Sequence, residues 1–439
     1  MDNQIDVEKE TLTLCNEVLS SISSQQTFFT KSNFRNISLK TLGRFPTFKK
    51  EIFRLITLFP SIQDKKVLVS RLSRTLSSLP CGGALAWAAS LCPFLTHRIF
   101  KFAVQNMASG VIAGKNADEA LPQLLKLRAQ NQSFTADLLG EFSMNEDDSL
   151  SYVSWYEETL HRLSYLNITH APIIKNHIGE RSPLCLAIKL SALYSQISLL
   201  NREKSIEILL RRVGSILCTA TKINAQIYFD AEDSLYNPIL YDVFEKLFTG
   251  NFRDFPYPGI VLQAYRKDSD DILERLKDIA RKRGSPISVR LVKGAYWDTE
   301  VKRANKYNIA PSVFLNKEST DAQFEKLAMN ILNNISLFMP AFAGHNIRSL
   351  CFAASYAKSL GIKKTQFEIQ TLYGMADNLS TAFSDLGFLV RVYVPIGDIV
   401  PGMGYLVRRL IENSSNESFL YALHTGVSKD HLKKPQFKD

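Results

Sequence analysis

Eight short apolar runs, separated by longer amphipathic segments, follow one another from Ser133 to Val394. They cover residues 134–139, 185–190, 225–229, 260–264, 288–292, 341–343, 366–371 and 390–394. Runs this short and apolar are typical of parallel strands buried on both faces, and segments between them, such as 270–282 and 349–358, have helical character. Eight such units close into a barrel within about 250 residues. We therefore predict an α/β fold, a (β/α)8 TIM-type barrel preceded by an α-helical region.

Polar side chains stand at or just beyond the carboxyl end of each predicted strand. They are Asp137 with Glu141, Lys189, Asp230, Gln263, Arg290 with Lys293, His345 with Asn346, Gln370 and Tyr393. A single polar residue at a strand end is usually a satisfied turn or cap. A set drawn from all the strands indicates a functional site, because barrels of this kind build their active sites at the carboxyl ends of the strands.

The stretch 405–413, Tyr-Leu-Val-Arg-Arg-Leu-Ile-Glu-Asn, follows the last strand and has the composition of a helix. Successive helix side chains point about 100° apart, so Arg408 and Arg409 cannot serve the same face. Glu412 lies four residues after Arg408 and three after Arg409, where it can brace either one. Arginine grips carboxylates and phosphates as a rigid fork. These arginines and the cations of the strand ends predict a site that binds anions.

The sequence Val-Lys-Gly-Ala-Tyr-Trp at 292–297 places a turn of small residues beside two aromatic rings. Such a turn lets a flat ring system lie close to the backbone. No serine or cysteine stands near a histidine as an activated nucleophile, and no isolated carboxylate pair suggests glycoside chemistry. The six cysteines form no CxxC pair and the seven histidines show no metal-binding spacing. We expect reduced thiols, a cytosol-like compartment and no metal.

The net charge of +10 over 439 residues is concentrated near the N-terminus. Residues 31–74 contain eleven Lys and Arg against two acidic residues, Glu51 and Asp64. From Arg44 onward, apolar residues recur with helical spacing and basic residues stand between them, which predicts a basic amphipathic helix. Its apolar face either packs on a core or contacts an anionic membrane surface.

Residues 75–97 contain no Asp, Glu, Lys or Arg, but prolines and glycines interrupt them at 80, 82, 83 and 93. Only 84–92 remains as clean helix, whereas a membrane span needs about 20 apolar residues. We expect a buried helix, or else a segment that seeks the membrane interface, and no span. Residues 1–30 are polar and predict no element. The acidic first ten residues resemble neither a secretory signal nor a transit peptide.

Seven stretches of the chain match one known family. They are Ser-Phe-Thr-Ala-Asp-Leu-Leu-Gly-Glu at 133–141, Ile-Lys-Leu-Ser-Ala-Leu at 188–193, Val-Arg-Leu-Val-Lys-Gly-Ala-Tyr-Trp at 289–297, Phe-Ala-Gly-His-Asn at 342–346, Phe-Glu-Ile-Gln-Thr-Leu-Tyr-Gly-Met at 367–375, Arg-Val-Tyr-Val-Pro-Ile-Gly at 391–397 and the stretch 405–413. Together they resemble the FAD-dependent proline dehydrogenase family, over roughly residues 110–420.

The resemblance implies a distorted (β/α)8 barrel with FAD at the carboxyl rim. The family oxidises L-proline to Δ1-pyrroline-5-carboxylate and passes the electrons to a membrane quinone. In that reaction a hydride leaves C5 of proline for N5 of the flavin, and the carboxylate must be held away from the reacting carbon. A cation near N5 would favour the reduced flavin.

Matched motif by motif, the resemblance also implies roles for individual residues. Lys189 and Arg408 match partners of the proline carboxylate, Tyr393 a wall against the proline ring, and Arg409 and Glu412 neighbours of both substrate and flavin. Asp230, Gln263, Arg290 and Gln370 match residues beside the flavin, and Val292, Lys293, Gly294, Ala295 and Trp297 match the loop that lines it. Lys317, Thr320, His345 and Asn346 match residues at the cofactor phosphates, ribose or adenine.

Two alternatives stay open. One is an FAD barrel with another substrate, hydroxyproline or a folate, although an extra hydroxyl on proline would meet the phenol of Tyr393. The other is a basic protein that binds nucleic acid through the N-terminal window. No helix-turn-helix or ribbon-helix-helix pattern supports it, so we expect no nucleic-acid partner.

We expect three parts: a basic helical region at 1–110, the FAD-binding barrel at 111–425 and a basic tail at 426–439. The chain is then a monofunctional proline dehydrogenase or a fragment of a longer bifunctional protein. Its expected partners are L-proline, a quinone and an anionic membrane surface. Its expected location is the cytoplasmic or mitochondrial-matrix side of the inner membrane, with peripheral association.

Overall fold

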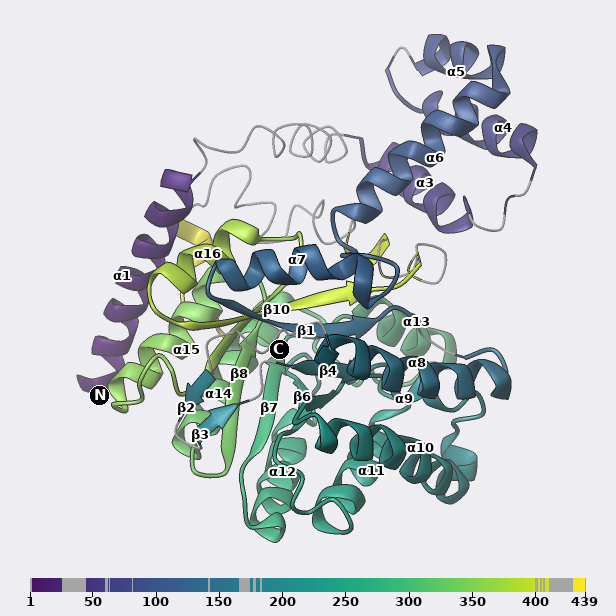
Figure 1. The fold of residues 1–439 in the computed structure, drawn as a ribbon. Coiled ribbons are helices and arrows are strands. Elements are labelled where there is room, and N and C mark those ends of the chain that lie inside the picture. The colour runs from purple at the N-terminus through teal and green to yellow at the C-terminus, as the bar shows by residue number, and fades with distance from the viewer. Residues whose placement is uncertain are drawn as a thin grey trace.

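The computed structural model shows a closed barrel of eight parallel strands with helices around it (Figure 1). It describes residues 2–25, 45–59, 62, 64–80, 82–140, 143–165, 174–176, 179–181, 184–398, 402, 405, 407–409 and 429–438. The barrel strands are β1 (Gln132–Leu138), β4 (Cys185–Ile188), β5 (Gln226–Phe229), β6 (Pro258–Gln263), β7 (Ile287–Val292), β8 (Phe338–Ala343), β9 (Glu368–Leu372) and β10 (Leu389–Ile396). The eight predicted strands, the α/β class and the barrel are confirmed.

The ring closes where the last strand meets the first. β10 runs parallel to β1 from the pair Gln132–Val390 to the pair Leu138–Ile396, and β1 also pairs with β4. Between β1 and β4, the sequence forms an antiparallel hairpin of β2 (Ile174–Asn176) and β3 (Gly179–Arg181), which was not predicted. Because all the barrel strands are parallel, their carboxyl ends meet at one rim.

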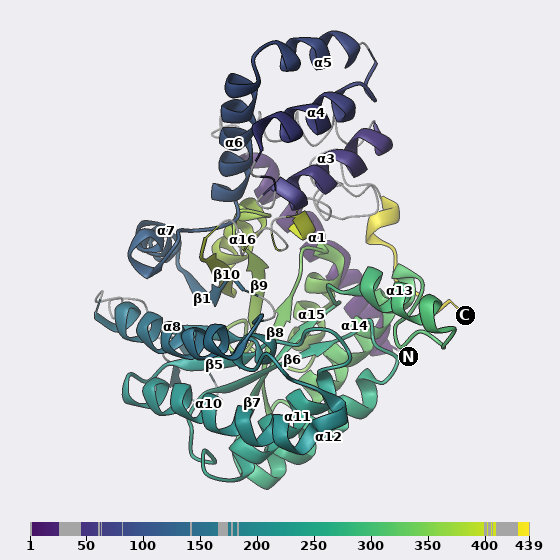
Figure 2. The same cartoon turned by 90° about the vertical axis from the view of Figure 1, so that its right-hand side faces the viewer.

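Helices connect the strands and cover the outside of the barrel (Figure 2). They are α8 (Glu146–Tyr165), α9 (Leu190–Leu193), α10 (Arg202–Lys222), α11 (Asn237–Thr249), α12 (Ser269–Arg283), α13 (Trp297–Tyr307), α14 (Lys317–Asn333), α15 (Ile347–Ser359) and α16 (Asp377–Asp385). The predicted helices at 270–282 and 349–358 correspond to α12 and α15. In α12, acidic residues in the first turn and basic residues in the last complement the helix dipole, and Gly284 ends the helix with a φ of 76°.

The strands are buried on both faces, as predicted, but their inner faces are not apolar. The outer faces pack with the helices in one hydrophobic core. Inside the barrel, Arg391 of β10 donates to both carboxylate oxygens of Glu368 on β9, each over 2.9 Å. These side chains are 0% and 2% exposed. The barrel interior therefore depends on balanced buried charge as well as on apolar packing.

The first helix, α1 (Asp2–Gln25), lies along the outside of the barrel against α15 and α16. It buries one stripe of side chains, Val7, Thr11, Leu14, Cys15, Val18 and Ile22. This spacing of three or four residues is the helical signal in a segment from which we predicted no element.

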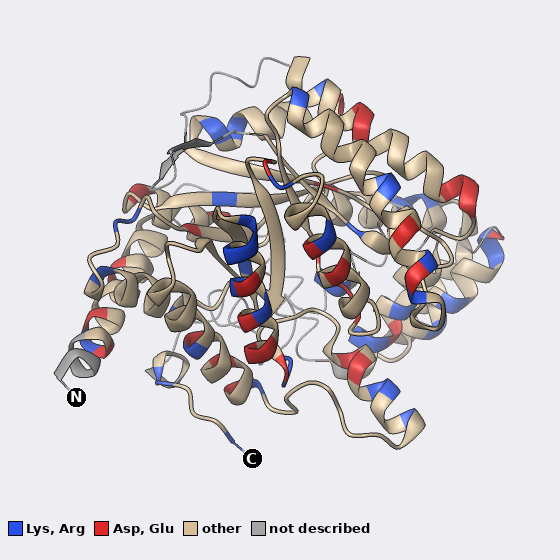
Figure 3. Cartoon of the chain, turned by 90° about the horizontal axis from the view of Figure 1, so that it is seen from below, with Lys and Arg blue, Asp and Glu red and all other residues tan. Residues whose placement is uncertain are grey.

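The next helices, α3 (Pro46–Leu58), α4 (Lys65–Leu76), α5 (Gly82–Leu91) and α6 (Pro93–Ser109), stand out beyond the barrel in Figure 1 and Figure 2. α7 (Ala117–Ala129) then leads into β1. Residues 45–109 contain nine Lys and Arg but only two acidic residues. On the barrel helices seen in Figure 3, acidic and basic residues are mixed. Within the described residues, the basic excess therefore lies mainly on the projecting helices.

α3 confirms the amphipathic helix predicted from Arg44 onward, and its Leu55 and Ile56 are buried. The expectation of a buried helix at 84–92 is wrong. α5 forms, but it packs through the small residues Gly82 and Ala86, so its large side chains point outward. Trp87 is 66% exposed. No helix within the described ranges is long and apolar enough to cross a membrane.

Replacing Arg391 by Met should lower the apparent free energy of unfolding by about 3–5 kcal/mol, because it leaves Glu368 as an uncompensated buried charge. Arg162 provides the control: it pairs with Glu158 at 3.9 Å, with both side chains more than half exposed. Its replacement by Met should change the free energy of unfolding by about 1 kcal/mol or less. Urea denaturation of the two variants measures the difference. Equal losses would contradict the importance of the interior pair.

Candidate active site

Four side chains from different strands meet inside the barrel near its carboxyl rim. Lys189, directly after β4, forms an ion pair with Asp137 of β1. Its Nζ also lies 3.4 Å from the hydroxyl of Tyr393 on β10 and 3.9 Å from Asp230, which follows β5. The Tyr393 hydroxyl donates to Asp230 over 2.5 Å. The structure thus brings together Lys189 and Tyr393, predicted for the substrate, with Asp230, predicted beside the flavin, and Asp137, predicted only as a polar strand end.

Arg290 of β7 extends this cluster across the barrel. Its Nη1 donates to Asp230 over 2.9 Å and its Nε donates to Gln370 of β9 over 2.7 Å. The guanidinium lies 4.0 Å from the ring centroid of Tyr228 and 5.3 Å from that of Tyr393. Its Nη2 is buried and has no hydrogen-bond partner among the residues that the structure describes. Arg290 is therefore fixed on one side and offers a donor on the other.

Gln370 joins this cluster to the ion pair deeper in the barrel. Its Nε2 donates to Glu368 over 2.8 Å, and Glu368 accepts from Arg391. Hydrogen bonds and ion pairs therefore run without a break from Arg391 to Lys189. A connected network of this kind restricts each side chain in it to one orientation.

The surroundings set the charge of each group. Burial alone would lower the pKa of Lys189, but the carboxylates of Asp137 and Asp230 raise it well above its usual value. Burial also raises the pKa of Asp137, to about 6, against the opposing effect of Lys189. Burial and the nearby carboxylates raise the pKa of Tyr393. Near neutral pH the cluster therefore contains an ammonium, a guanidinium and a neutral phenol that donates to Asp230.

A second cluster lies between β7 and the first turns of α14 and α15. Asp321 of α14 pairs with Lys293, which follows β7, and accepts from Asn346 over 3.3 Å. Lys317 lies 3.9 Å from the same carboxylate. Burial lowers the pKa of Lys293, although Asp321 opposes this. Three residues predicted for the cofactor, Lys293, Lys317 and Asn346, are thus gathered around one carboxylate that was not predicted.

The remaining residues of the predicted phosphate and adenine side lie around these helix starts. Asn346 accepts from the backbone of Ser349 over 3.3 Å and begins α15. His345 Nε2 accepts from the backbone N–H of Leu372 over 3.1 Å, so it bridges β8 and β9. Thr320 lies in the first turn of α14 and donates to a backbone oxygen of that turn. Two helix N-termini therefore open beside Lys293 and Lys317, and helix N-termini favour anions.

The loop after β7 keeps its shape through Gly294. This glycine has a φ of 132°, and a Cβ there would lie 2.5 Å from the ring of Tyr265. Trp297, 40% exposed, donates from Nε1 to the backbone oxygen of Phe314 over 2.9 Å. Val292 is partly buried, and Ala295 is exposed. Only glycine fits at 294, and because this residue is exposed, the loop backbone is open to a neighbour on its solvent side.

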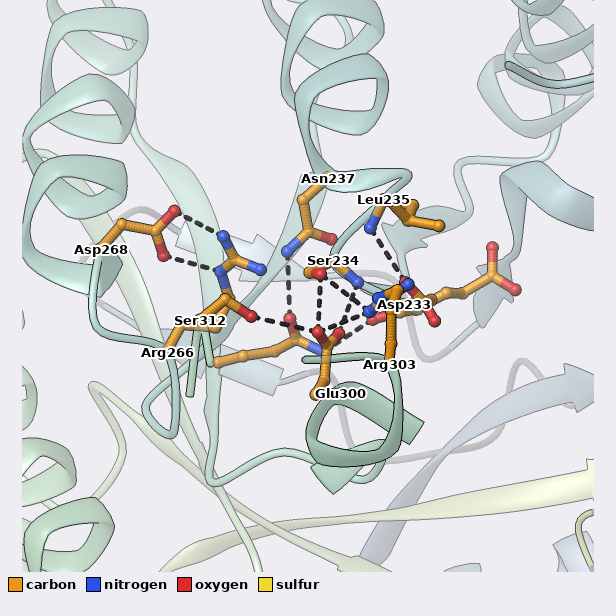
Figure 4. Close-up of polar contacts among 11 residues, drawn as sticks. Asp233, Ser234, Leu235, Asn237, Arg266, Asp268, Glu300, Arg303 and Ser312 are labelled. Carbon is orange, nitrogen blue, oxygen red and sulfur yellow. Dashed lines mark hydrogen bonds and ion pairs between the residues drawn. The ribbon is translucent and has the colours of Figure 1, made fainter. Parts of the chain in front are cut away.

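Gln263, at the end of β6, is held by neighbouring polar groups of the protein. It accepts from Asn237 over 3.1 Å and donates to the backbone oxygen of Glu232 over 3.1 Å. Figure 4 shows the polar cluster beside it: Ser234 donates to Glu300 of α13 through its backbone and its hydroxyl, and Arg303 pairs with Glu300. Gln263 thus supports the loop that starts at Asp230, and its contact with a flavin stays a prediction.

The two adjacent arginines of the stretch 405–413 have different neighbours, as expected. Residues 405 and 407–409 are helical. Arg408 lies 5.3 Å from the ring centroid of Tyr296 in the loop after β7, and Arg409 lies 5.1 Å from that of Tyr405. Arg408 is therefore next to the loop predicted to line the cofactor. Glu412, like Glu141, is outside the described residues.

The chain matches the family model described as proline dehydrogenase over residues 120–422. The chain belongs to the proline dehydrogenase family. This confirms the resemblance found in the sequence motifs and the class of oxidoreductase that it implied. Proline dehydrogenase 2 of Bacillus subtilis is 28% identical over 319 residues, which are 72% of this chain and 89% of that protein.

Longer proteins of the family are also similar. Bifunctional protein PutA of Escherichia coli is 31% identical over 339 residues, which are 75% of this chain but 25% of that protein. A crystal structure of proline utilization A from Bdellovibrio bacteriovorus matches with a TM-score of 0.87 and 33% identity, over 98% of this chain and 44% of that one. The chain thus spans about a quarter of the length of the bifunctional relatives in sequence, and under half of this solved structure.

Proposed function

We propose that this chain oxidises L-proline to Δ1-pyrroline-5-carboxylate with FAD as its cofactor. The observation that carries the proposal is the buried cluster of Lys189, Asp230, Arg290 and Tyr393 at the rim of a proline dehydrogenase barrel. Three of these side chains come from sequence stretches that resemble the family most closely. Their shared site combines fixed cations with a neutral phenol, which suits a small anionic amino acid.

The residues at the rim fit FAD. Arg290 offers a buried Nη2 that lacks a hydrogen-bond partner within the described ranges, and a carbonyl or ring nitrogen of a flavin would satisfy it. Gly294 is exposed, so the backbone of the next loop is accessible to a flat ring. Lys293, Lys317 and the starts of α14 and α15 suit a diphosphate. When bound, FAD supplies the isoalloxazine ring that accepts a hydride.

The chain's own residues would hold the substrate. An ammonium has three donors, and Lys189 donates to Asp137 and Tyr393 while Asp230 lies 3.9 Å away as an ion-pair partner. We propose that the proline carboxylate replaces Tyr393 or Asp230, the two more distant partners, beside the Lys189 ammonium. Arg408 would be the second partner of the carboxylate. Tyr393, held by its short bond to Asp230, would form a wall against the ring. Arg409 and Glu412 would then lie beside both substrate and flavin.

Replacing Lys189 or Arg408 by Met should raise KM for proline by about tenfold or more and leave flavin content nearly unchanged. Each loses one charge-assisted contact, which costs about 1.5–3 kcal/mol. Steady-state kinetics on flavin-saturated enzyme and the ratio of flavin absorbance to protein measure the two effects.

Lys277 provides a matched control, because it is a lysine with 7% exposure on α12 that pairs with Glu274 away from the rim. Its replacement by Met should alter neither quantity. Loss of FAD from the Lys189 and Arg408 variants, with an unchanged KM in the remaining holoenzyme, would contradict their assignment to the carboxylate.

We further propose that the electrons pass to a membrane quinone and that the projecting helices dock on the anionic surface of that membrane. Large apolar side chains are exposed on α5 and α6: Leu85, Trp87, Leu91, Phe94, Leu95, Ile99 and Phe102, each more than half exposed. Lys65 and Arg98 lie 5.0 and 5.7 Å from the ring centroid of Phe94. Apolar residues with a basic rim are typical of peripheral membrane binding.

The proposed location is the cytoplasmic or matrix face of the inner membrane. There the protein should bind phosphatidylserine-containing vesicles at low salt, should detach at high salt and should not bind phosphatidylcholine alone. Each engaged Lys or Arg contributes about 1 kcal/mol near such a surface, and salt screens that attraction. Vesicle flotation measures the bound fraction.

The double variant Trp87→Ala with Phe94→Ala should lose most of this binding, whereas Leu200→Ala should keep it. Leu200 is 100% exposed on the barrel, so it controls for apolar surface as such. Binding that persists in high salt would indicate insertion instead of docking. Equal recovery with both kinds of vesicle would contradict the proposal and favour nucleic acid as the partner of the basic helices.

A further inference from the structure

Arg348 is a buried arginine that contacts several segments of the chain and lies outside the Lys189 and Asp321 clusters. It lies in the first turn of α15, two residues after Asn346, and is 2% exposed. It forms an ion pair with Glu8 of α1, where Nη2 to Oε2 is 2.7 Å. Its Nε lies 3.1 Å from Glu325 of α14, and its Nη1 donates to the backbone oxygen of Leu432 over 3.1 Å. One guanidinium thus holds four segments of the chain together.

The segments that meet at Arg348 come from opposite ends of the sequence. Glu8 is 340 positions away and Leu432 is 84 positions away. α1 lies beside α15 in both Figure 1 and Figure 2. The segment 429–438 continues along α14, where Lys438 pairs with Glu318 at 2.6 Å. Both segments therefore fasten onto the pair of helices α14 and α15.

Two separate contacts fix α14 against α15. Arg348 of α15 binds Glu325 of α14, and Asp321, one turn before Glu325, binds Asn346 at the start of α15. Asp321 also pairs with Lys293 from β7. The two contacts close a ring between the helices, so a shift of one helix would break both. The position of Lys293 is set by the same ring.

The contacts between α14 and α15 depend on the charge of Arg348. Asp321 and Glu325 are adjacent carboxylates on α14, and each is neutralised by a cation from another element. Burial raises the pKa of Glu325 to about 6, against the opposing effect of Arg348. Without Arg348, Glu325 either takes up a proton or attracts Lys293, which also acts on it electrostatically. Either outcome alters the arrangement around Lys293, Asp321 and Asn346.

We propose that Arg348 is a positioning residue that, through Glu325 and Glu8, holds the first turns of α14 and α15 in the arrangement that binds the phosphate and adenosine end of FAD. The proposal rests on the FAD site of the proposed function. Arg348 would not touch the cofactor. It would set the geometry of Lys293, Lys317 and Asn346, which would contact the cofactor.

The test is the dissociation constant for FAD, measured by the fluorescence of flavin released on dilution of the holoenzyme. Arg348→Met should raise it on the order of tenfold, as expected when one site is coupled to another. KM for proline, measured at saturating FAD, should stay within about twofold, because the proline side of the barrel is left intact. Glu8→Gln, which keeps the Arg348–Glu325 pair, should weaken FAD binding at least about twofold.

Lys358→Met provides the matched control. Lys358 lies on the same helix and pairs with Glu10 of α1 at 2.5 Å, but its side chain is 69% exposed. This variant should bind FAD as the wild type does. If Arg348→Met does not fold, Glu8→Gln decides the question. Unchanged FAD affinity in both variants would overturn the proposal for Arg348 alone, whereas a wild type without FAD affinity would overturn the proposed function as well.

Discussion

The structure depends on keeping charge balanced inside a closed barrel. Arg391, Arg290 and Lys189 face Glu368, Asp230 and Asp137, and each cation meets a carboxylate from another strand or strand end. In a desolvated interior an unpaired charge is costly, so these partners restrict one another. The strand register brings these charges close together. Arg391 of β10 pairs with Gln370 of β9, two residues after Glu368, and Asp137 of β1 pairs with Ala187 of β4, two residues before Lys189.

This constraint also prepares the proposed active site. Arg290 is held by Asp230 and Gln370, so its Nη2, which has no hydrogen-bond partner in the described part of the chain, points in a fixed direction. Tyr393 is held by Asp230 in the same way. Donors that are already oriented need no reorganisation when charge develops during a reaction. The ion pairs that make the interior stable are therefore the same contacts that position the proposed catalytic groups.

Much of the fold was predictable because local pattern determines it. The apolar runs identified each strand, and the rule that barrels carry sites at the carboxyl rim brought Lys189, Asp230, Arg290 and Tyr393 together. The stripe of α1, with Leu14, Cys15 and Val18 at helical spacing, was available in the sequence but lay within a polar segment. The composition of α5 suggested burial, yet Trp87 is exposed, because small residues form the packing face of that helix.

What the sequence could not reveal is the pairing between distant charges. Nothing in a helical or strand pattern links Glu8 to Arg348, or Asp137 to Lys189, because those contacts arise only when distant segments pack together in the folded chain. Asp321 had a weak local signal, four residues after Lys317 on one helix face, but its partners Lys293 and Asn346 come from other elements. Gln263 was assigned from a motif, while its hydrogen bonds support the loop after β5.

The most direct test of the account is an anaerobic titration of the purified protein with L-proline, followed by visible absorption. The proposed function predicts a flavin spectrum that bleaches as proline is added, because proline would reduce the bound cofactor. A protein that carries flavin but shows no change with proline would contradict the assigned substrate. A protein that binds no flavin at all would contradict the proposed function of the buried cluster.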